Sequence, residues 1–344
     1  IHDYFLQDKS TAHIGIIGPQ KAAATLEGSK AFAKEFMVRH QIPTASYAEF
    51  TASNIAEGEA FLAKTKSPYV LKADGLAAGK GVVILEDLEE AKKELRRMLL
   101  DKKFGSASAK VVIEEFLAGI ELSCFVLTDG ENYVTLPMAK DYKRIGEGDT
   151  GLNTGGMGAI SPVPFVTEAF KEKIDKKIVR PTIEGLKKDG MPYKGFVFIG
   201  LIKVGEEPKV IEYNVRLGDP ETEVVLPRLK TDLLSILTAV HTGRLNEITL
   251  EIEPKTAATV MAVSGGYPEA YEKGKQVKGL ENTELVFHAG TRLEGEQVVT
   301  NGGRVLAATS FGESFNEAVT KSFETLEKIN FEGMHYRKDI GFDL

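Results

Sequence analysis

The chain has 344 residues, of which 42% are hydrophobic and 27% are charged, the composition of an ordinary globular protein with room for two or more domains. A net charge of -7 argues against a bulk electrostatic affinity for nucleic acid or an anionic membrane. The one cysteine, Cys124, lies in an apolar run, so we expect a buried structural thiol in a reducing compartment. No apolar run is long enough to cross a bilayer and no signal peptide opens the chain, so we expect a cytoplasmic protein.

The first 40 residues predict the end of a helix over 1–7, a short buried strand over 13–18 and a helix over 21–40. One strand cannot form a domain, so residues 13–18 are interpreted as the last strand of a sheet whose remainder is missing. Lys30 lies on the long helix, where a solvated lysine would be the ordinary interpretation.

A loop of small residues joins two predicted strands, 69–73 and 82–85, after a predicted helix over 53–64. It holds Gly75, Gly79 and Gly81 and is flanked by Lys72 and Lys80. Glycine lets backbone N–H groups turn toward an anion, and lysine adds a point charge. The pattern predicts a phosphate-binding loop of a kind other than the Walker loop, with a flexible hairpin as the alternative.

A predicted helix over 87–100 precedes a strand over 110–116, which contains Glu114 and leads into a turn from Leu117 to Glu121. The turn could be a hinge that accepts a purine, with Glu121 near ribose hydroxyls; solvated carboxylates are the alternative. A hairpin is predicted for 122–128 and 132–138 across Asp129-Gly130.

The segment 140–158 is long, glycine-rich and without apolar periodicity. It carries Lys143, Arg144 and Asp149, so it is interpreted as a mobile substrate-binding loop, with a disordered linker as the alternative. A helix over 167–188 follows, capped by Thr167 and kinked at Pro181.

A second hairpin, 194–204 with 208–216, ends in the most polar stretch of the chain. On a strand, Glu212, Asn214 and Arg216 share one face. Carboxylate and amide oxygens suit Mg²⁺, and arginine suits phosphate or carboxylate oxygens. A half-buried strand facing water is the alternative.

The remaining residues are predicted to be β-rich, with helices only over 231–241 and 314–329. Strands are expected at 258–263, 284–288, 297–300 and 304–309, the last two joined by a tight hairpin at Gly302-Gly303. This half has no clustered acids or phosphate loop, so it is interpreted as a structural lid or wall.

The phosphate loop and the acidic strand call for one ligand, a nucleoside triphosphate with Mg²⁺ held between two β-layers. This arrangement resembles the ATP-grasp superfamily. Five parts of the chain are similar to the glycinamide ribonucleotide synthetase (phosphoribosylamine–glycine ligase) family: 26–32 (LEGSKAF), 72–81, 148–158, 216–223 (RLGDPETE), and 288–291 with 301–305.

The resemblance implies an α+β ATP-grasp fold, in which two α+β subdomains grip ATP, with a C-terminal mixed β domain. Residues 1–20 would be the remnant of an N-terminal nucleotide-fold domain that the family carries and this sequence lacks. Residues 21–44 and 111–250 would form the large subdomain, 45–110 the small lid subdomain, and 251–344 the C-terminal domain.

The resemblance also implies roles for single residues. Lys30 and Lys72 would hold the α- and β-phosphates, and the loop containing Gly75, Gly79, Lys80 and Gly81 would close over them. Glu114 and Leu117 would bind adenine and Glu121 the ribose. Glu212 and Asn214 would bind Mg²⁺ (or Mn²⁺). Arg216 would stabilise the transferred phosphoryl group, and Asp219 with 149–158 would face glycine and the ribose phosphate.

The family implies ATP-dependent ligation of glycine to 5-phosphoribosylamine through glycyl phosphate, in purine synthesis. We expect a monomer whose partners are these small molecules, with no nucleic acid or membrane. Another ATP-grasp ligase, acting on formate or bicarbonate, and a catalytically silent Mg-ATP-binding module are the alternatives. One departure is the segment Ala139-Lys140-Asp141-Tyr142, where the family suggests Gln-Asp-His.

Overall fold

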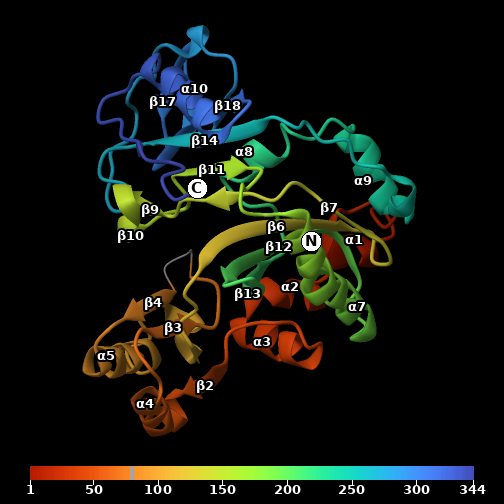
Figure 1. Cartoon of the computed structure of the whole chain (residues 1–344), viewed down its shortest axis with the longest axis vertical. Coiled ribbons are helices and arrows are strands. Elements are labelled where there is room, and N and C mark those ends of the chain that lie inside the picture. The colour runs from red at the N-terminus through yellow and green to blue at the C-terminus, as the bar shows by residue number, and fades with distance from the viewer. Residues whose placement is uncertain (78–80) are drawn as a thin grey trace.

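The computed structural model describes residues 1–77 and 81–344. Its elements form three units, each built around an antiparallel sheet (Figure 1). The first, here called the small unit, is a four-stranded sheet in the order β2-β5-β3-β4, packed against two helices. Its elements are β2 (Tyr47–Thr51), α4 (Ile55–Lys64), β3 (Tyr69–Ala73), β4 (Val82–Leu85), α5 (Leu88–Leu99) and β5 (Lys110–Glu114).

The small unit follows the predicted elements closely. The stripe of α5 buries Ala91, Leu95 and Met98 in the core of the unit, and Asp87 caps the helix by accepting a hydrogen bond from the Glu90 N–H. The boundary predicted between residues 110 and 111 falls inside β5, which pairs with both β2 and β3. The small unit therefore extends to Glu114.

The central unit is a sheet in the order β1-β12-β6-β7, with β13 also paired to β12. Its strands are β1 (Gly18–Pro19), β6 (Ile120–Thr128), β7 (Tyr133–Thr135), β12 (Tyr193–Val204) and β13 (Glu207–Asn214). Helices α2 (Lys21–Gly28), α3 (Lys30–Arg39), α6 (Glu168–Ile174) and α7 (Arg180–Lys188) contribute to its core.

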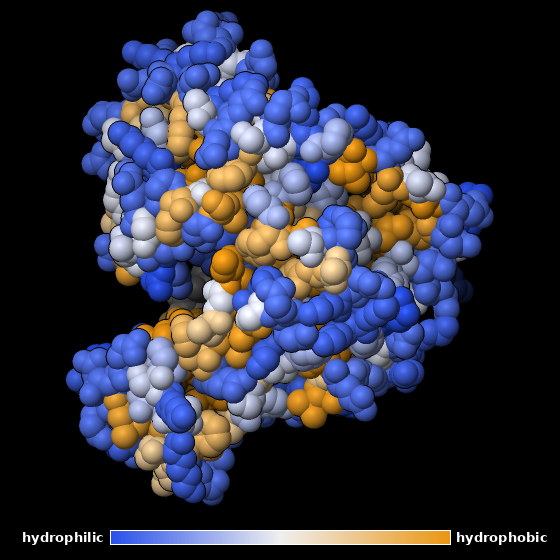
Figure 2. Space-filling view, in the orientation of Figure 1, coloured by the Kyte–Doolittle hydropathy of each residue, from blue (hydrophilic) through white to orange (hydrophobic). Residues whose placement is uncertain are grey.

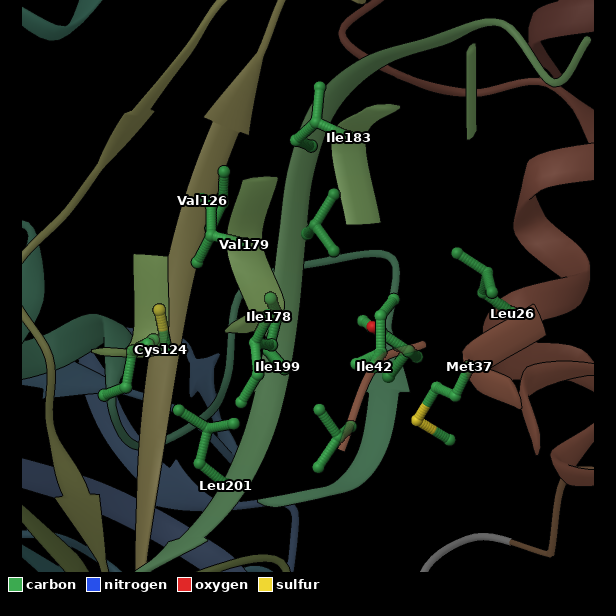
Figure 3. Close-up of a cluster of buried hydrophobic side chains, with 14 of the residues drawn as sticks. Leu26, Met37, Ile42, Cys124, Val126, Ile178, Val179, Ile183, Ile199 and Leu201 are labelled. Atoms are coloured by element: carbon green, nitrogen blue, oxygen red, sulfur yellow. The ribbon is translucent and has the colours of Figure 1, made fainter. Parts of the chain in front are cut away.

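Both faces of the central sheet are buried, because neighbouring residues of β6 enter different cores. Cys124 and Val126 pack with Ile199 and Leu201 in the core that the helices complete (Figure 3). Phe125 points to the other face and stacks on Phe198 at 5.2 Å between ring centroids. Burial raises the pKa of the Cys124 thiol to about 12, which fits a structural thiol.

The C-terminal unit is a five-stranded sheet in the order β15-β18-β14-β11-β8, on which α10 packs. Its elements are β8 (Lys140–Asp141), β11 (Gly158–Ser161), β14 (Thr256–Val263), β15 (Val286–His288), β18 (Arg304–Gly312) and α10 (Phe315–Glu327). Two of its strands precede residue 250: β8 lies in the segment 140–158, which was predicted to be a loop, and β11 begins at the last residue of that segment. The boundary predicted at residues 250 and 251 therefore divides one sheet.

The other elements are shorter or lie at the edges of these units. They are α1 (His2–Gln7), β9 (Arg144–Gly146), β10 (Thr150–Asn153), α8 (Thr222–Val225), α9 (Leu233–Thr242), β16 (Thr291–Glu294) and β17 (Gln297–Thr300). Across residues 1–77 and 81–344, no helix has the length and apolarity that a membrane span requires.

Three further predictions of secondary structure are wrong. Of the predicted strand 13–18, only Gly18 pairs, with Lys194 of β12. The predicted hairpin at Gly302-Gly303 does not form, because β17 pairs with β16 whereas β18 pairs with β14 and β15. The predicted helix 21–40 is two helices, α2 and α3, separated at Ser29.

The break at Ser29 positions the residue after it. Ser29 is extended, and its hydroxyl accepts a hydrogen bond from the Phe32 N–H and donates one to the Asp74 carboxylate at 2.9 Å. Asp74 also accepts from the Ala31 N–H at 2.8 Å. Lys30 is thus the first residue of α3, held beside the loop that follows β3.

Pro181 is accommodated without ending its helix. A π-helical turn at Asp175–Val179 joins α6 to α7, and Pro181 lies in the first turn of α7. Pro181 has no N–H group to donate, and the wider π-helical turn directly before it lets the helix continue without that hydrogen bond.

Candidate active site

A cleft of about 690 Å³ lies between the small unit and the rest of the molecule. Figure 2 shows a hollow on the left, between the lower lobe and the body. The lining includes Lys72, Leu76 and Gly81 of the small unit, Lys30 of α3, and residues from Ile211 to Asp219. Segments that lie far apart in the sequence therefore share one cavity.

A β-bulge in β13 determines which side chains reach the cleft. Gly200 pairs with Glu212 but Leu201 pairs with Val210, so Ile211 is the extra residue. Val210 is therefore buried in the central core, as is Tyr213, while Ile211 joins Glu212 in lining the cleft. The strand alternation predicted for Glu212, Asn214 and Arg216 therefore does not extend back to Ile211, because of this bulge.

Lys30 and Lys72, which were predicted to bind phosphates, lie in the cleft together with a third lysine, Lys34. Lys72 and Lys34 both pair with Oε2 of Glu114, at 3.0 and 3.1 Å, and all three side chains are buried. Burial lowers the pKa of Lys34 to about 8, although the Glu114 carboxylate counteracts it. Burial also lowers the pKa of Lys30, which Glu212 opposes.

Glu114 itself has one unused oxygen. Its Oε1 is buried and has no hydrogen-bond partner within the described residues, and Glu114 lines the cleft. A buried carboxylate oxygen without a partner is uncommon, and this one can accept a hydrogen bond from a ligand that enters the cleft.

The end of β13 is held by Glu27 of α2. Glu27 accepts a hydrogen bond from the Val215 N–H at 2.8 Å, and its other oxygen lies 3.4 Å from Nε of Arg216. Arg216 also donates to Oδ1 of Asn214 at 3.3 Å. Arg216 and Asn214 therefore face the cleft with their positions fixed from the helix behind them.

Asp219 connects three parts of the chain through Arg304. The Arg304 guanidinium pairs with the Asp219 carboxylate at 2.9 Å and donates to the carbonyls of Asp219 and Gly155, at 3.0 and 2.7 Å. The cleft-lining turn after β13 is thereby tied to the glycine-rich segment and to β18 of the C-terminal unit.

Carboxylates surround one lysine on the far wall of the cleft. Lys143 pairs with Glu121 at 2.6 Å and lies 3.8 Å from Asp141. Burial alone would lower the pKa of Lys143, but the carboxylates raise it well above its ordinary value. Lys143 lowers the pKa of Glu121, whereas burial raises that of Asp141.

Glu221 completes this acidic wall. It is buried and accepts a hydrogen bond from the Ser123 hydroxyl at 2.8 Å. Burial, reinforced by the Asp141 carboxylate, raises the pKa of Glu221 to about 7. The wall therefore offers several carboxylates to one lysine, and an arriving cationic group would find a favourable potential.

Residues 140–142, where the sequence departs from the family pattern, contact the C-terminal end of the chain. Lys140 pairs with Asp343 at 3.1 Å, the Tyr142 hydroxyl donates to the same carboxylate at 3.0 Å, and the Lys140 ammonium lies 4.0 Å from the Tyr142 ring centroid. Both residues that differ from the family pattern thus share Asp343, which lines the cleft.

The oxygen atoms of Glu212 and Asn214 fit a hard divalent cation. Both residues line the cleft, and Asn214 Oδ1 keeps a lone pair beyond its bond with Arg216. Among the described residues there is no group of three or more His, Cys, Asp or Glu side chains that could enclose a metal. An ion here would take much of its coordination from water and phosphate oxygens, as Mg²⁺ commonly does.

Most of the residues predicted for the site meet in this cleft. Those that line it are Lys30, Lys72, Gly81, Glu114, Glu121, Glu212, Asn214, Arg216 and Asp219. Gly75 lies beside it, since its carbonyl is 3.4 Å from Lys30 Nζ, whereas Leu117 is not part of the lining. Gly79 and Lys80 lie outside the described residues.

Several lining residues were assigned no role from the sequence: Glu27, Lys34, Lys140, Glu221 and Asp343. Lys34 follows Lys30 by four positions and so shares its helix face, a signal that was available. Glu221 stands inside the 216–223 motif. Nothing in the sequence links Asp343 to Lys140, because that contact depends on the tertiary fold.

Two β-layers that face one cleft, one presenting lysines and the other a carboxylate, an amide and an arginine, define an ATP-grasp protein. Models of known families agree with this class. Residues 28–222 match the phosphoribosylglycinamide synthetase ATP-grasp (A) domain, and residues 257–343 match its C domain.

Individual relatives and a solved structure point to the same family. The phosphoribosylamine–glycine ligase of Vibrio vulnificus (strain YJ016) is 46% identical over 336 residues, which cover 96% of this chain and 78% of that protein. That of Chlorobaculum tepidum is 48% identical over 333 residues, covering 95% and 78%. The crystal structure of the Thermotoga maritima phosphoribosylamine–glycine ligase superposes with a TM-score of 0.88 at 40% identity, covering 97% of this chain and 83% of that one.

A more distant structure shares the fold alone. The biotin carboxylase domain of the Hydrogenobacter thermophilus 2-oxoglutarate carboxylase, solved with MgADP and bicarbonate, gives a TM-score of 0.70 at 17% identity, covering 97% and 72% of the two chains. The chain described here belongs to the phosphoribosylglycinamide synthetase family.

Proposed function

We propose that this chain joins glycine to 5-phosphoribosylamine with ATP, giving glycinamide ribonucleotide, ADP and phosphate, the second step of purine synthesis. The observation that carries the proposal is the single cleft in which Lys30, Lys72, Glu212, Asn214 and Arg216 meet. Family membership supports the choice of substrates over the other reactions that ATP-grasp proteins perform.

The reaction needs two displacements at one place. A carboxylate oxygen of glycine attacks the γ-phosphorus of ATP, ADP leaves, and glycyl phosphate forms. The amine nitrogen of phosphoribosylamine then attacks the carbonyl carbon, phosphate leaves, and the nitrogen gives up one proton. Neither step needs a covalent bond to the protein, so catalysis depends on positioning and on charge neutralisation.

The phosphates of ATP would bind on the side of the cleft that carries the lysines and Arg216. Lys30 and Lys72 would hold the α- and β-phosphates, and Arg216 would neutralise charge that develops on the transferred phosphoryl group. Glu212 and Asn214 would hold a divalent ion, Mg²⁺ or Mn²⁺, which when bound neutralises charge on the phosphate oxygens.

The nucleoside would occupy the adjoining part of the cleft. Ile211, which the bulge places there, gives an apolar surface for the purine ring. The unpaired Oε1 of Glu114 can accept a hydrogen bond from the adenine amino group, and Glu121 can bind the ribose hydroxyls. Leu117 would contribute only through its backbone in the turn after β5.

Glycine would lie by the acidic wall. Its ammonium group would face Asp141 and Glu221, and its carboxylate would point toward the phosphates. Asp219, fixed by Arg304, would hold the glycine-rich segment 149–158 against the second substrate. The chain would work as a monomer.

The test is ADP formation by the purified chain with Mg-ATP, glycine and phosphoribosylamine, omitting each in turn. We expect ADP release that requires glycine and a product that requires both. Turnover with formate or bicarbonate in place of glycine would favour another ATP-grasp ligase. Tight Mg-ATP binding without turnover on any acid would favour a silent binding module.

A further inference from the structure

Only two stretches of chain connect the small unit to the central unit. One runs from α3 into β2 and includes Pro43, Thr44 and Ser46; the other leaves β5 through Glu114 and Glu115. The two stretches lie side by side: the Glu115 N–H donates to the Ser46 carbonyl at 3.0 Å, and the Ser46 N–H to the Glu115 carboxylate at 3.1 Å. We call this pair of stretches the crossing.

The crossing is joined to β13 of the central sheet. The Val210 N–H donates to the Pro43 carbonyl at 2.8 Å, and the Thr44 hydroxyl donates to the Val210 carbonyl at 2.7 Å. Val210 directly precedes the bulged Ile211 and Glu212. The orientation of the small unit and the position of the acidic strand therefore depend on the same few residues.

Lys34 binds both stretches at once. From α3 its ammonium donates to the Thr44 hydroxyl at 2.9 Å and to the Ala45 carbonyl at 3.2 Å, and pairs with Glu114 at 3.1 Å. Its exposed fraction is 1%, so water contributes little to its solvation. These three partners use all three ammonium protons.

Of the three partners of Lys34, Glu114 matters most for the position of Lys72, because it pairs with both lysines. Both lysines lie on Oε2 of Glu114, and Lys72 comes from β3 of the small unit. Without Lys34, Glu114 would have a single cation and would no longer be tied to α3. Lys72 could then follow Glu114 away from the place where a phosphate must meet it.

We propose that Lys34 is a positioning residue that fixes the angle of the small unit and, through Glu114, the place of the Lys72 ammonium in the nucleotide site. This inference rests on the proposed function for the identity of the ligand. Lys34 needs no contact with that ligand, because it acts through Thr44, Ala45 and Glu114.

The test is isothermal titration calorimetry of Mg-ATP with matched variants. Lys34→Met keeps most of the side-chain volume and removes the charge; losing charge-assisted hydrogen bonds at a buried site should weaken Mg-ATP binding about 10- to 100-fold. Lys34→Arg should not restore binding, since a longer planar cation does not fit a fully buried site made for an ammonium. The KM for ATP should rise far more than the KM for glycine.

The control is Lys209→Met at the same crossing. Lys209 pairs with Glu115 at 3.3 Å, but its side chain is 31% exposed, so binding should change less than about 3-fold.

Thr44→Val removes the hydroxyl between Lys34 and Val210 at nearly constant volume. It should weaken binding several-fold and add little to Lys34→Met, and it serves as the test if Lys34→Met does not fold.

The outcomes separate the two proposals. If the unaltered chain does not bind Mg-ATP, the proposed function fails and this inference with it. If it binds but Lys34→Met behaves like Lys209→Met, this inference alone is overturned. A full effect of Lys34→Met with none from Thr44→Val would overturn the part of the proposal that concerns the angle of the small unit, and the effect on Lys72 would then run through Glu114 alone.

Discussion

Replacing Arg337 with methionine should destabilise the protein and release part of the substrate segment. Arg337 is fully buried, and its guanidinium holds the Asp339 carboxylate with two hydrogen bonds of 2.8 Å. It also donates to Asp149 at 2.7 Å and to the Arg144 carbonyl at 3.1 Å. Asp149 has a φ of 53°, which is uncommon for a residue other than glycine, so the segment needs this support.

The magnitude follows from the exposure of each partner. Breaking a buried ion pair costs about 3–5 kcal/mol, whereas an exposed pair contributes at most about 1 kcal/mol. The Asp339 side chain is 18% exposed and that of Asp149 is 45% exposed, so Asp149 can regain water and Asp339 largely cannot. We expect Arg337→Met to lower the free energy of unfolding by about 3 kcal/mol, and Arg337→Lys, which loses the fork, by about half of that.

The effect should depend on pH in a definite direction. Burial alone would raise the pKa of Asp339, but hydrogen bonds from Arg337 and the Gly148 N–H outweigh it, so the pKa lies below its ordinary value. A lowered folded-state pKa gives stability that is present above the unfolded pKa, about 4, and is lost as the pH falls through the folded value. The difference between wild type and Arg337→Met should therefore be larger at pH 7 than at pH 4.

Urea denaturation at both pH values, with limited proteolysis of segment 147–155, measures these effects. Arg292→Met is the matched control, because Arg292 pairs with Glu294 in the same unit but is 48% exposed. It should change the free energy of unfolding by less than about 0.5 kcal/mol. A loss below about 1 kcal/mol for Arg337→Met, or no faster cleavage of the segment, would refute the reasoning.

Three further predictions concern single side chains. Glu212→Gln should raise the Mg²⁺ concentration for half-maximal activity about tenfold or more while leaving urea stability unchanged, and unaltered metal dependence would contradict its role. Glu223→Gln should stabilise the protein by about 1 kcal/mol at pH 8 and not at pH 5. Burial and the Asp219 carboxylate raise the pKa of Glu223 to about 7, so wild-type stability declines as the pH rises from about 4.5 through 7; equal effects at both pH values would refute this. Cys124 should react with a thiol reagent only after unfolding, and stoichiometric labelling of the native chain would show that its burial is misjudged.

Local patterns in the sequence were enough for many elements. The strands at 69–73 and 82–85 and the helix capped by Asp87 have the predicted bounds to within a residue or two, because alternation and capping are local signals. Ser29 ends a helix for a reason that lies 45 residues away, at Asp74. The predicted hairpin at Gly302-Gly303 fails for a different reason: β17 forms a hairpin with β16, directly before it in the chain, and only β18 pairs with a distant strand, β14.

The residues of the site also divide into those that the sequence identified and those whose role depends on the tertiary fold. Residue types and spacing were enough to select Lys72 and Glu212, and the family resemblance added Lys30; all three share the cleft, although their roles in binding remain predictions. Lys34 looked like any helical lysine, because its burial comes from two stretches that meet only in the folded chain. Arg337 was overlooked in a half of the chain that offered no cluster of charges.

The five-stranded sheet combines strands from before and after residue 250, and this limits where the chain can be cut into fragments that fold. Because β11 pairs with β14, a polypeptide stopped at residue 250 would expose one edge of β11 along its whole length and remove most of the core around Ile160. A minimal catalytic fragment is therefore not obtained by trimming the tail. Recombination between homologues should tolerate exchange of residues 47–114 far better than exchange of residues 251–344, since the small unit has its own sheet and core and the chain enters and leaves it at the crossing.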